Sequence, residues 1–134
     1  MRIIHAVLLV SVLLYAAIGE KVGPAEPRDL KILPQLFALP AILNVGIALF
    51  ARSRVVRAAE EALRLPPDDA PALARWRAGN ILALALCESV ALLGFVLRVL
   101  GGTLLISAPF YGAAFLLMLL WAPRLEVSAV GGGQ

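Results

Sequence analysis

The stretch that decides the fold is "LALCESVALLGFVL", residues 84–97, in which a single acid, Glu88, interrupts an otherwise apolar run. The whole chain has the same character, because 61% of its 134 residues are hydrophobic, only 16% are charged and its mean hydropathy is +0.91. A soluble domain of this size keeps too much of its surface exposed to hide so much apolar area. The sequence therefore predicts a single all-α integral membrane domain over residues 1–134.

This run lies within the third of four apolar segments, which are found at about 3–19, 30–51, 80–100 and 103–122. Each is close to the roughly 20 residues that a helix needs to cross about 30 Å of hydrocarbon. We therefore predict four transmembrane helices in an up-down-up-down bundle. The first segment also has the basic start and apolar core of a signal peptide, so residues 1–19 are either a retained helix or a cleaved signal peptide.

The orientation follows from the basic residues. Eight of them fall on the side that holds both termini, and four fall on the other side. The eight are Arg2, Arg52, Arg54, Arg57, Arg64, Arg75, Arg77 and Arg124, and the four are Lys21, Arg28, Lys31 and Arg98. The positive-inside rule then predicts that both termini are cytoplasmic. Trp76 and Trp121 would meet at the inner interface, where indoles are enriched.

Residues 52–79 are predicted to form a helical hairpin that extends the second and third transmembrane helices into the cytoplasm. "ARSRVVRAAEEALRL" has helix-forming composition, and "PPDDAP" breaks the helix. Asp69 can cap a new helix that starts near Ala70. The hairpin either docks a cytoplasmic partner or serves as a solvated connector. Residues 126–134, "EVSAVGGGQ", are expected to be disordered.

Composition argues against an enzyme, a metal site and a cofactor site. The chain has one cysteine, Cys87, and one histidine, His5, so neither a metal-ligand cluster nor a nucleophile–base pair can be assembled from them. The basic residues are spread along the chain, and this distribution does not indicate nucleic-acid binding. We expect no catalytic residue, no metal ligand and no cofactor.

Two narrow faces of small residues indicate close helix packing. On the third transmembrane helix, Ala83, Cys87 and Ala91 recur at every fourth position, and Gly94 lies on the same side. On the second helix, Pro40 and Ala48 share a face with Asn44. Small residues in such stripes let neighbouring membrane helices approach closely.

Glu88 is the residue that needs an explanation, because an ionisable group within a membrane helix is a candidate functional site by default. Counted from the cytoplasmic helix ends, Glu88 and Asn44 lie at the same depth, about 12 Å in at 1.5 Å per residue. Ser11 lies at a similar depth and Tyr15 one turn above it. We predict a Glu88–Asn44 hydrogen bond supplemented by Ser11 or Tyr15. Because a buried unpaired carboxylate is costly, we expect Glu88 to carry a proton.

Residues Glu88 to Val96, "ESVALLGFV", resemble the ion-binding helix of the proteolipid (c) subunits of rotary ATP synthases. The match comprises the carboxylate and the offsets of Ser89, Ala91, Leu92, Gly94 and Val96. The resemblance implies that Glu88 carries a proton or sodium ion, with Ser89 beside a sodium site. The chain departs from that family in having one glycine, Gly46, on the partner helix and a connecting loop of more than twenty residues.

Two functional interpretations follow. In the first, the protein is a small structural or accessory subunit that packs with other membrane helices, and Glu88 serves assembly. In the second, Glu88 titrates during proton or cation translocation. In both, the chain is a multi-pass protein, expected in a bacterial cytoplasmic (inner) membrane. Its partners are then the lipid bilayer and either further copies of itself or other membrane subunits.

Overall fold

A computed structural model of the chain describes residues 2–64 and 68–122, and within these ranges the regular structure is entirely helical. The elements are α1 (Arg2–Val22), α2 (Leu33–Phe50), the π-helix η1 (Ala51–Val56), α3 (Arg57–Ala62), α4 (Ala70–Val99) and α5 (Leu104–Leu120). The predicted disorder of residues 126–134 lies outside the described residues. The all-α class is confirmed.

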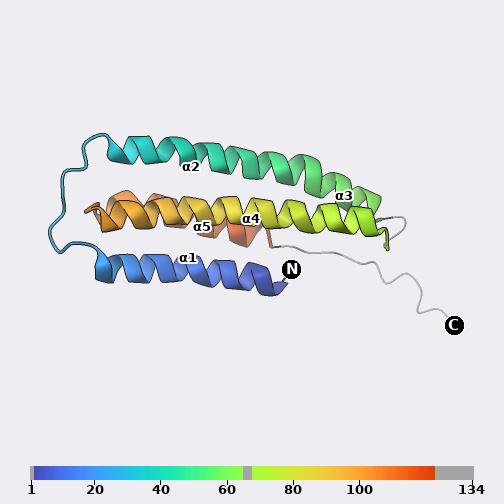
Figure 1. Cartoon of the computed structure of the whole chain (residues 1–134), viewed down its shortest axis with the longest axis horizontal. Helices are drawn as coiled ribbons and strands as arrows, with labels where there is room; N and C mark the ends of the chain where they lie inside the picture. The colour runs from blue at the N-terminus through green and yellow to red at the C-terminus, as the bar shows by residue number, and fades with distance from the viewer. Residues whose placement is uncertain (1, 65–67, 123–134) are drawn as a thin grey trace.

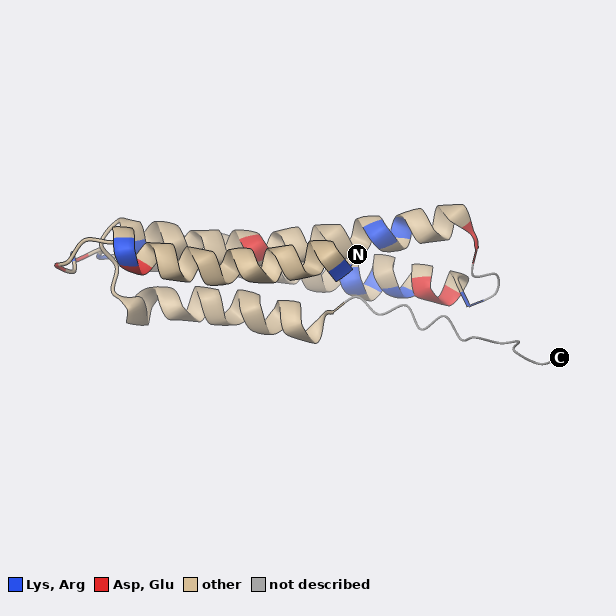
Figure 2. Ribbon diagram, turned by 90° about the horizontal axis from the view of Figure 1, so that it is seen from below, with Lys and Arg blue, Asp and Glu red and all other residues tan. Residues whose placement is uncertain are grey.

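The described residues form four helical rods, because α2, η1 and α3 follow one another without a break over Leu33–Ala62. Successive rods run in opposite directions (Figure 1). The long helix α4 is the central element and contacts α1, α2 and α5. The rods α1 and α2 lie on opposite sides of α4, and α5 lies behind it (Figures 1 and 2).

Three of the four predicted spans are long and apolar enough to cross a membrane. They are Arg2–Val22, Leu33–Ala62 and Ala70–Val99. The fourth, α5, is apolar but has only 17 residues, which is the lower end of the range for spanning helices. It is also shorter than the predicted segment 103–122, because Thr103 caps the helix before its first turn and the helix ends at Leu120.

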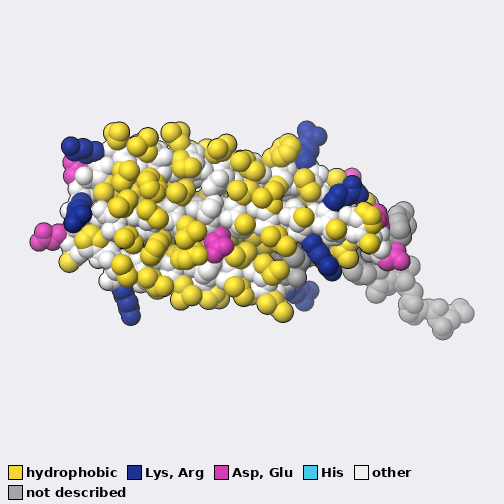
Figure 3. Space-filling view, viewed as in Figure 1, with side chains coloured by type: hydrophobic (Ala, Val, Ile, Leu, Met, Phe, Trp, Pro, Cys, Tyr) yellow, Lys and Arg dark blue, Asp and Glu magenta, His cyan; other side chains and the backbone are white. Residues whose placement is uncertain are grey.

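The surface of the molecule is unusually apolar. Large hydrophobic side chains are exposed on α1, α2, α4 and α5, with Leu105 84% exposed and Ile42 69% exposed. They cover most of the face in Figure 3. Basic and most acidic positions gather toward the two ends of the bundle (Figure 2). An apolar surface of this extent is too large for an ordinary soluble monomer.

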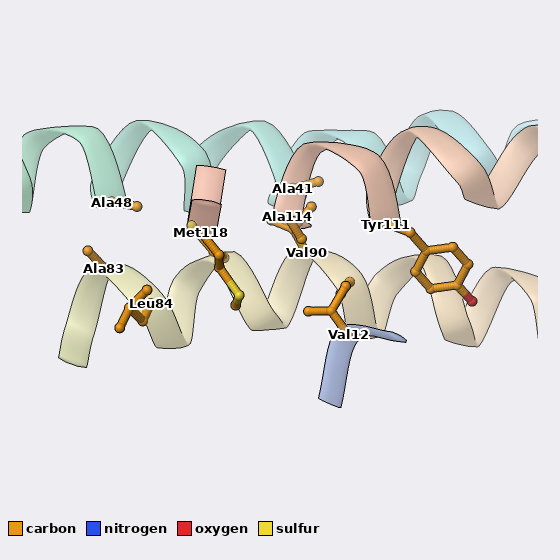
Figure 4. Close-up of a cluster of buried hydrophobic side chains, with 11 residues drawn as sticks. Val12, Ala41, Ala48, Ala83, Leu84, Val90, Tyr111, Ala114 and Met118 are labelled. Carbon is orange, nitrogen blue, oxygen red and sulfur yellow. The ribbon is translucent and has the colours of Figure 1, made fainter. Parts of the chain in front are cut away.

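The main core follows α4 and contains many small side chains (Figure 4). Cys87 and Ala91 are fully buried, Ala83 is 2% exposed, and Ala48 of α2 is fully buried. Small residues at these positions let α4 and the helices around it approach closely. Pro40, which was expected on the packed face of α2, is exposed, and Ala41 is buried in its place. Helix α2 is rotated about its own axis so that Pro40 points outward and Ala41 points into the core.

Helix ends are capped as elementary hydrogen bonding requires. The side chain of Asp69 accepts a hydrogen bond from the Ala72 amide at 3.4 Å, which confirms the predicted start of α4. After α4, Gly101 adopts a φ of +112°, and the Gly102 amide donates to the Leu97 carbonyl at 2.8 Å. This is the glycine-terminated helix end that lets α5 fold back along α4 within a few residues.

The hairpin has a small core of its own, separate from the main one. It consists of Val56, Ala59, Leu63, Ala72 and Trp76. Trp76 is therefore not at the surface as an interfacial indole: it is 3% exposed, and its ring N–H donates to Glu60 Oε1 at 3.3 Å. Packing against η1 decides this, because Gly79 has no side chain and Val56 fits against the backbone there.

Candidate functional site

Glu88 lies in the middle of α4, and its side chain is directed at α1. Its Oε1 atom accepts hydrogen bonds from Ser11 Oγ at 2.7 Å and from Tyr15 OH at 2.9 Å. Ser11 and Tyr15 are four residues apart, so they lie on one face of α1 and reach the same oxygen. Both predicted supplementary partners are thus brought to Glu88.

Asn44 binds elsewhere. Its Nδ2 donates to Ser89 Oγ at 2.7 Å, so the predicted Glu88–Asn44 bond is wrong. The reason is geometric, because successive residues on a helix point about 100° apart. Glu88 therefore faces α1, and Ser89 faces α2. The predicted depth of Asn44 along the bundle agrees with that of Glu88 to within one residue. The predicted direction of the Asn44 side chain, toward Glu88, was wrong.

These five residues form two neighbouring hydrogen-bonded groups at one height across three helices. We call them together the central polar patch: Ser11 and Tyr15 on α1, Glu88 and Ser89 on α4, and Asn44 on α2. All five side chains are half-buried. Residues 78–97 contain no other charged residue than Glu88, and acidic atoms reach the surface in the middle of the apolar face (Figure 3).

Some polar atoms of the patch have no hydrogen-bond partner within the described part of the chain. There, Glu88 Oε2 and Asn44 Oδ1 have no hydrogen-bond partner, and the second amide hydrogen of Asn44 is also free. No cation pairs with Glu88 among the described residues. The ion pair that they do contain, Arg98–Glu20 at 2.8 Å, lies at the far end of α4 and joins it to the end of α1.

The remaining chemistry-bearing residues do not assemble into a reactive site. Among residues 2–64 and 68–122, no three His, Cys, Asp or Glu side chains come together as a metal site would require. Cys87 is a free, fully buried thiol in the α4 core. His5 is buried, and its Nε2 contacts the Met118 carbonyl at 2.7 Å, where α5 approaches its end.

One polar cluster, around Arg52 and Asn80, was not predicted from the sequence. Arg52 at the start of η1 donates to Asn80 Oδ1 at 3.4 Å, and its guanidinium lies 5.7 Å from the centre of the Trp121 ring. Asn80 is 2% exposed and also donates to the Trp76 carbonyl at 2.9 Å. The presence of an asparagine among small residues was the available signal. The cluster joins η1, α4 and the end of α5, and periodicity on one helix does not indicate such contacts between helices.

A scan against family models and searches of curated proteins and of solved structures found no match to this chain.

Proposed function

We propose that the protein is a multi-pass integral membrane protein with both termini in the cytoplasm, and that it acts as a structural or accessory subunit that packs with other membrane helices. The exposed apolar surface supports insertion, because lipid is the solvent in which such a surface is stable. The basic residues of 52–79 favour a cytoplasmic hairpin. The proposal treats Glu88 as a group that holds helices together.

The observation that carries the proposal is the pair of hydroxyl donors on Glu88. Both Ser11 and Tyr15 come from α1, so the contact joins α1 to α4 at mid-height. In an apolar solvent such interhelical hydrogen bonds stabilise a helix pair by about 0.6–2 kcal/mol each. Tyr15 also packs on Phe95 of α4 with ring centroids 6.0 Å apart, so a second contact joins the same two helices.

The Ser11 hydroxyl also ties this contact to the backbone of α1. Ser11 Oγ lies 2.7 Å from Glu88 Oε1 and 2.8 Å from the Leu8 carbonyl oxygen. A serine hydroxyl has one hydrogen, so these two acceptors share it. In the proposed role, Glu88 is thus the acceptor on α4 that holds both hydroxyl groups of α1.

The substitution Glu88→Gln tests the proposal. Glutamine keeps an oxygen acceptor and an N–H donor at the same position but cannot release a proton. We expect Glu88→Gln to insert, fold and assemble as the wild type does, measured by yield and by thermal stability in mild detergent. Glu88→Met, which is similar in size but apolar, should be destabilised by about 1–3 kcal/mol because Ser11 and Tyr15 lose their shared partner.

A second function, proton or cation translocation through Glu88, has one observation in its favour. Glu88 is half-buried and its Oε2 is unpaired within the described residues, so the carboxyl group is open on one side at mid-height. Purified protein in liposomes with an internal pH dye distinguishes the two functions. Equal proton flux for wild type and Glu88→Gln supports the structural role. A flux present in wild type and absent in Glu88→Gln would establish translocation and overturn it.

A further inference from the structure

The central polar patch lies on a face of the bundle that the described helices leave open. On α4, the exposed residues Ala85, Leu92 and Val96 point between the directions of Glu88 and Ser89. The rods α1 and α2 flank this face on either side, and α5 covers the opposite side of α4 (Figures 1 and 2). The face is therefore a strip of α4 with the patch across its middle.

Lipid acyl chains cannot form hydrogen bonds with the unpaired polar atoms on this face. In the hydrocarbon region there is no water to pair with Glu88 Oε2 or with the free amide groups of Asn44, so each costs free energy when it faces acyl chains. An apolar pocket between α2 and α5 is different. Its lining includes Ala41, Ile42, Val90 and Phe110, and an acyl chain covers such a surface without loss.

We propose that a second copy of this chain covers the face, in a parallel dimer whose two-fold axis runs along the bundle. In this dimer the Asn44 amide of each copy donates its free hydrogen to Glu88 Oε2 of the other copy. The inference rests on the proposed membrane insertion, and it names the partner of the proposed subunit.

Symmetry makes the two groups complementary. Seen from outside, Glu88 lies toward α1 and Asn44 toward α2, and they share a height because Asn44 binds Ser89, the neighbour of Glu88. A two-fold axis parallel to the helices exchanges the two sides of the face and keeps every height. It therefore sets Glu88 of one copy opposite Asn44 of the other, twice. A two-fold axis perpendicular to the helices would instead place Glu88 opposite Glu88 and Asn44 opposite Asn44.

Packing permits the approach. Ala85 lies near the centre of the strip and Ser89, four residues on, lies at its α2 edge, and small residues at this spacing let two helix backbones come close in a membrane. The existing bonds within each copy stay in place, because Glu88 Oε1 keeps Ser11 and Tyr15 while Asn44 keeps Ser89. The second copy uses only the atoms that are unpaired in the described chain.

Cross-linking of full-length protein in liposomes tests the dimer. In a Cys87→Ala background, Ala85→Cys and Leu92→Cys place a thiol beside the proposed axis, and mild oxidation should yield covalent dimers. Leu116→Cys on α5, a position 60% exposed and outside the face, is the matched control and should yield few. Asn44→Ala and Glu88→Met should each weaken the dimer about tenfold through the loss of two hydrogen bonds.

Mixing the two defective variants gives the sharper result. A dimer of one Asn44→Ala chain with one Glu88→Met chain keeps one intact Asn44–Glu88 pair, whereas neither variant alone keeps any. With differently tagged chains in equal amounts, random pairing alone gives twice as many mixed dimers as either single-variant dimer, and the one recovered hydrogen bond should raise that ratio by about a further threefold. A variant that had merely misfolded would not be rescued by mixing.

The proposal is overturned if neither Ala85→Cys nor Leu92→Cys forms dimers above the Leu116→Cys control, or if mixing restores nothing. Such a result with normal insertion and stability would leave the proposed accessory role in place and assign the face to a different membrane protein. Failure of the chain to insert would instead overturn the proposed function itself.

Discussion

Gly94 lies where α4 packs tightly against α5, and Gly94→Ala tests whether that tight packing is required. A Cβ atom built on Gly94 would lie 2.7 Å from Phe110 Cβ and 3.2 Å from the Ser107 carbonyl oxygen. Carbon atoms in contact prefer about 3.5–4.0 Å, so α4 and α5 would have to separate by about 1 Å. Rotation of the Phe110 side chain gives no relief, because Cβ is attached directly to the backbone.

The magnitude is best measured against a glycine with free space around it. Gly46 on α2 and Gly112 on α5 have no neighbouring atom within 4 Å of a built Cβ. All three substitutions gain helix propensity of up to about 1 kcal/mol, and this gain cancels in a comparison. Gly94→Ala carries the additional cost of overpacking, about 1–3 kcal/mol. We therefore expect Gly94→Ala to be less stable than Gly46→Ala and Gly112→Ala by that amount.

Reversible unfolding in mixed detergent micelles, followed by circular dichroism, measures the three free energies of unfolding. If Gly94→Ala matches Gly46→Ala within about 0.5 kcal/mol, the close approach of α4 and α5 is not a feature of the folded protein. If Gly112→Ala proves equally destabilising, the loss comes from α5 itself and the steric reasoning is refuted.

Three further predictions concern the ends of the bundle. His5→Phe should destabilise the protein by about 1–2 kcal/mol in the same assay, because it leaves the buried Met118 carbonyl without its side-chain partner, and an unchanged stability would contradict the contact. Gly101→Ala should cost about 1–3 kcal/mol, since φ is +112° there and a Cβ would meet Arg28 Cβ at 2.9 Å; Gly112→Ala is its control. In a Cys87→Ala background, an impermeant maleimide should label Ser53→Cys only from the cytoplasmic side and Glu26→Cys only from the outer side of membrane vesicles; the reverse pattern would refute the proposed orientation.

The helical class and the approximate limits of the helices could be predicted from the sequence because they depend on local properties. Apolar run length sets each span, and a residue such as Asp69 caps the helix that immediately follows it. Glu88 also stood out locally, as the one charged residue between Arg77 and Arg98. The similar height of Ser11, Asn44 and Glu88 followed from counting residues along each helix.

Only the tertiary structure decided which of these groups pair. The rotation of each helix about its axis and its position around α4 are set by the packing of all helices together, and no single segment encodes them. Thus Ser11 and Tyr15 bind Glu88, Asn44 binds Ser89, and Pro40 turns outward while Ala41 is buried. Sequence determines the depth of a residue, because depth accumulates along one helix. Which neighbour a side chain meets at that depth depends on the arrangement of three helices around α4.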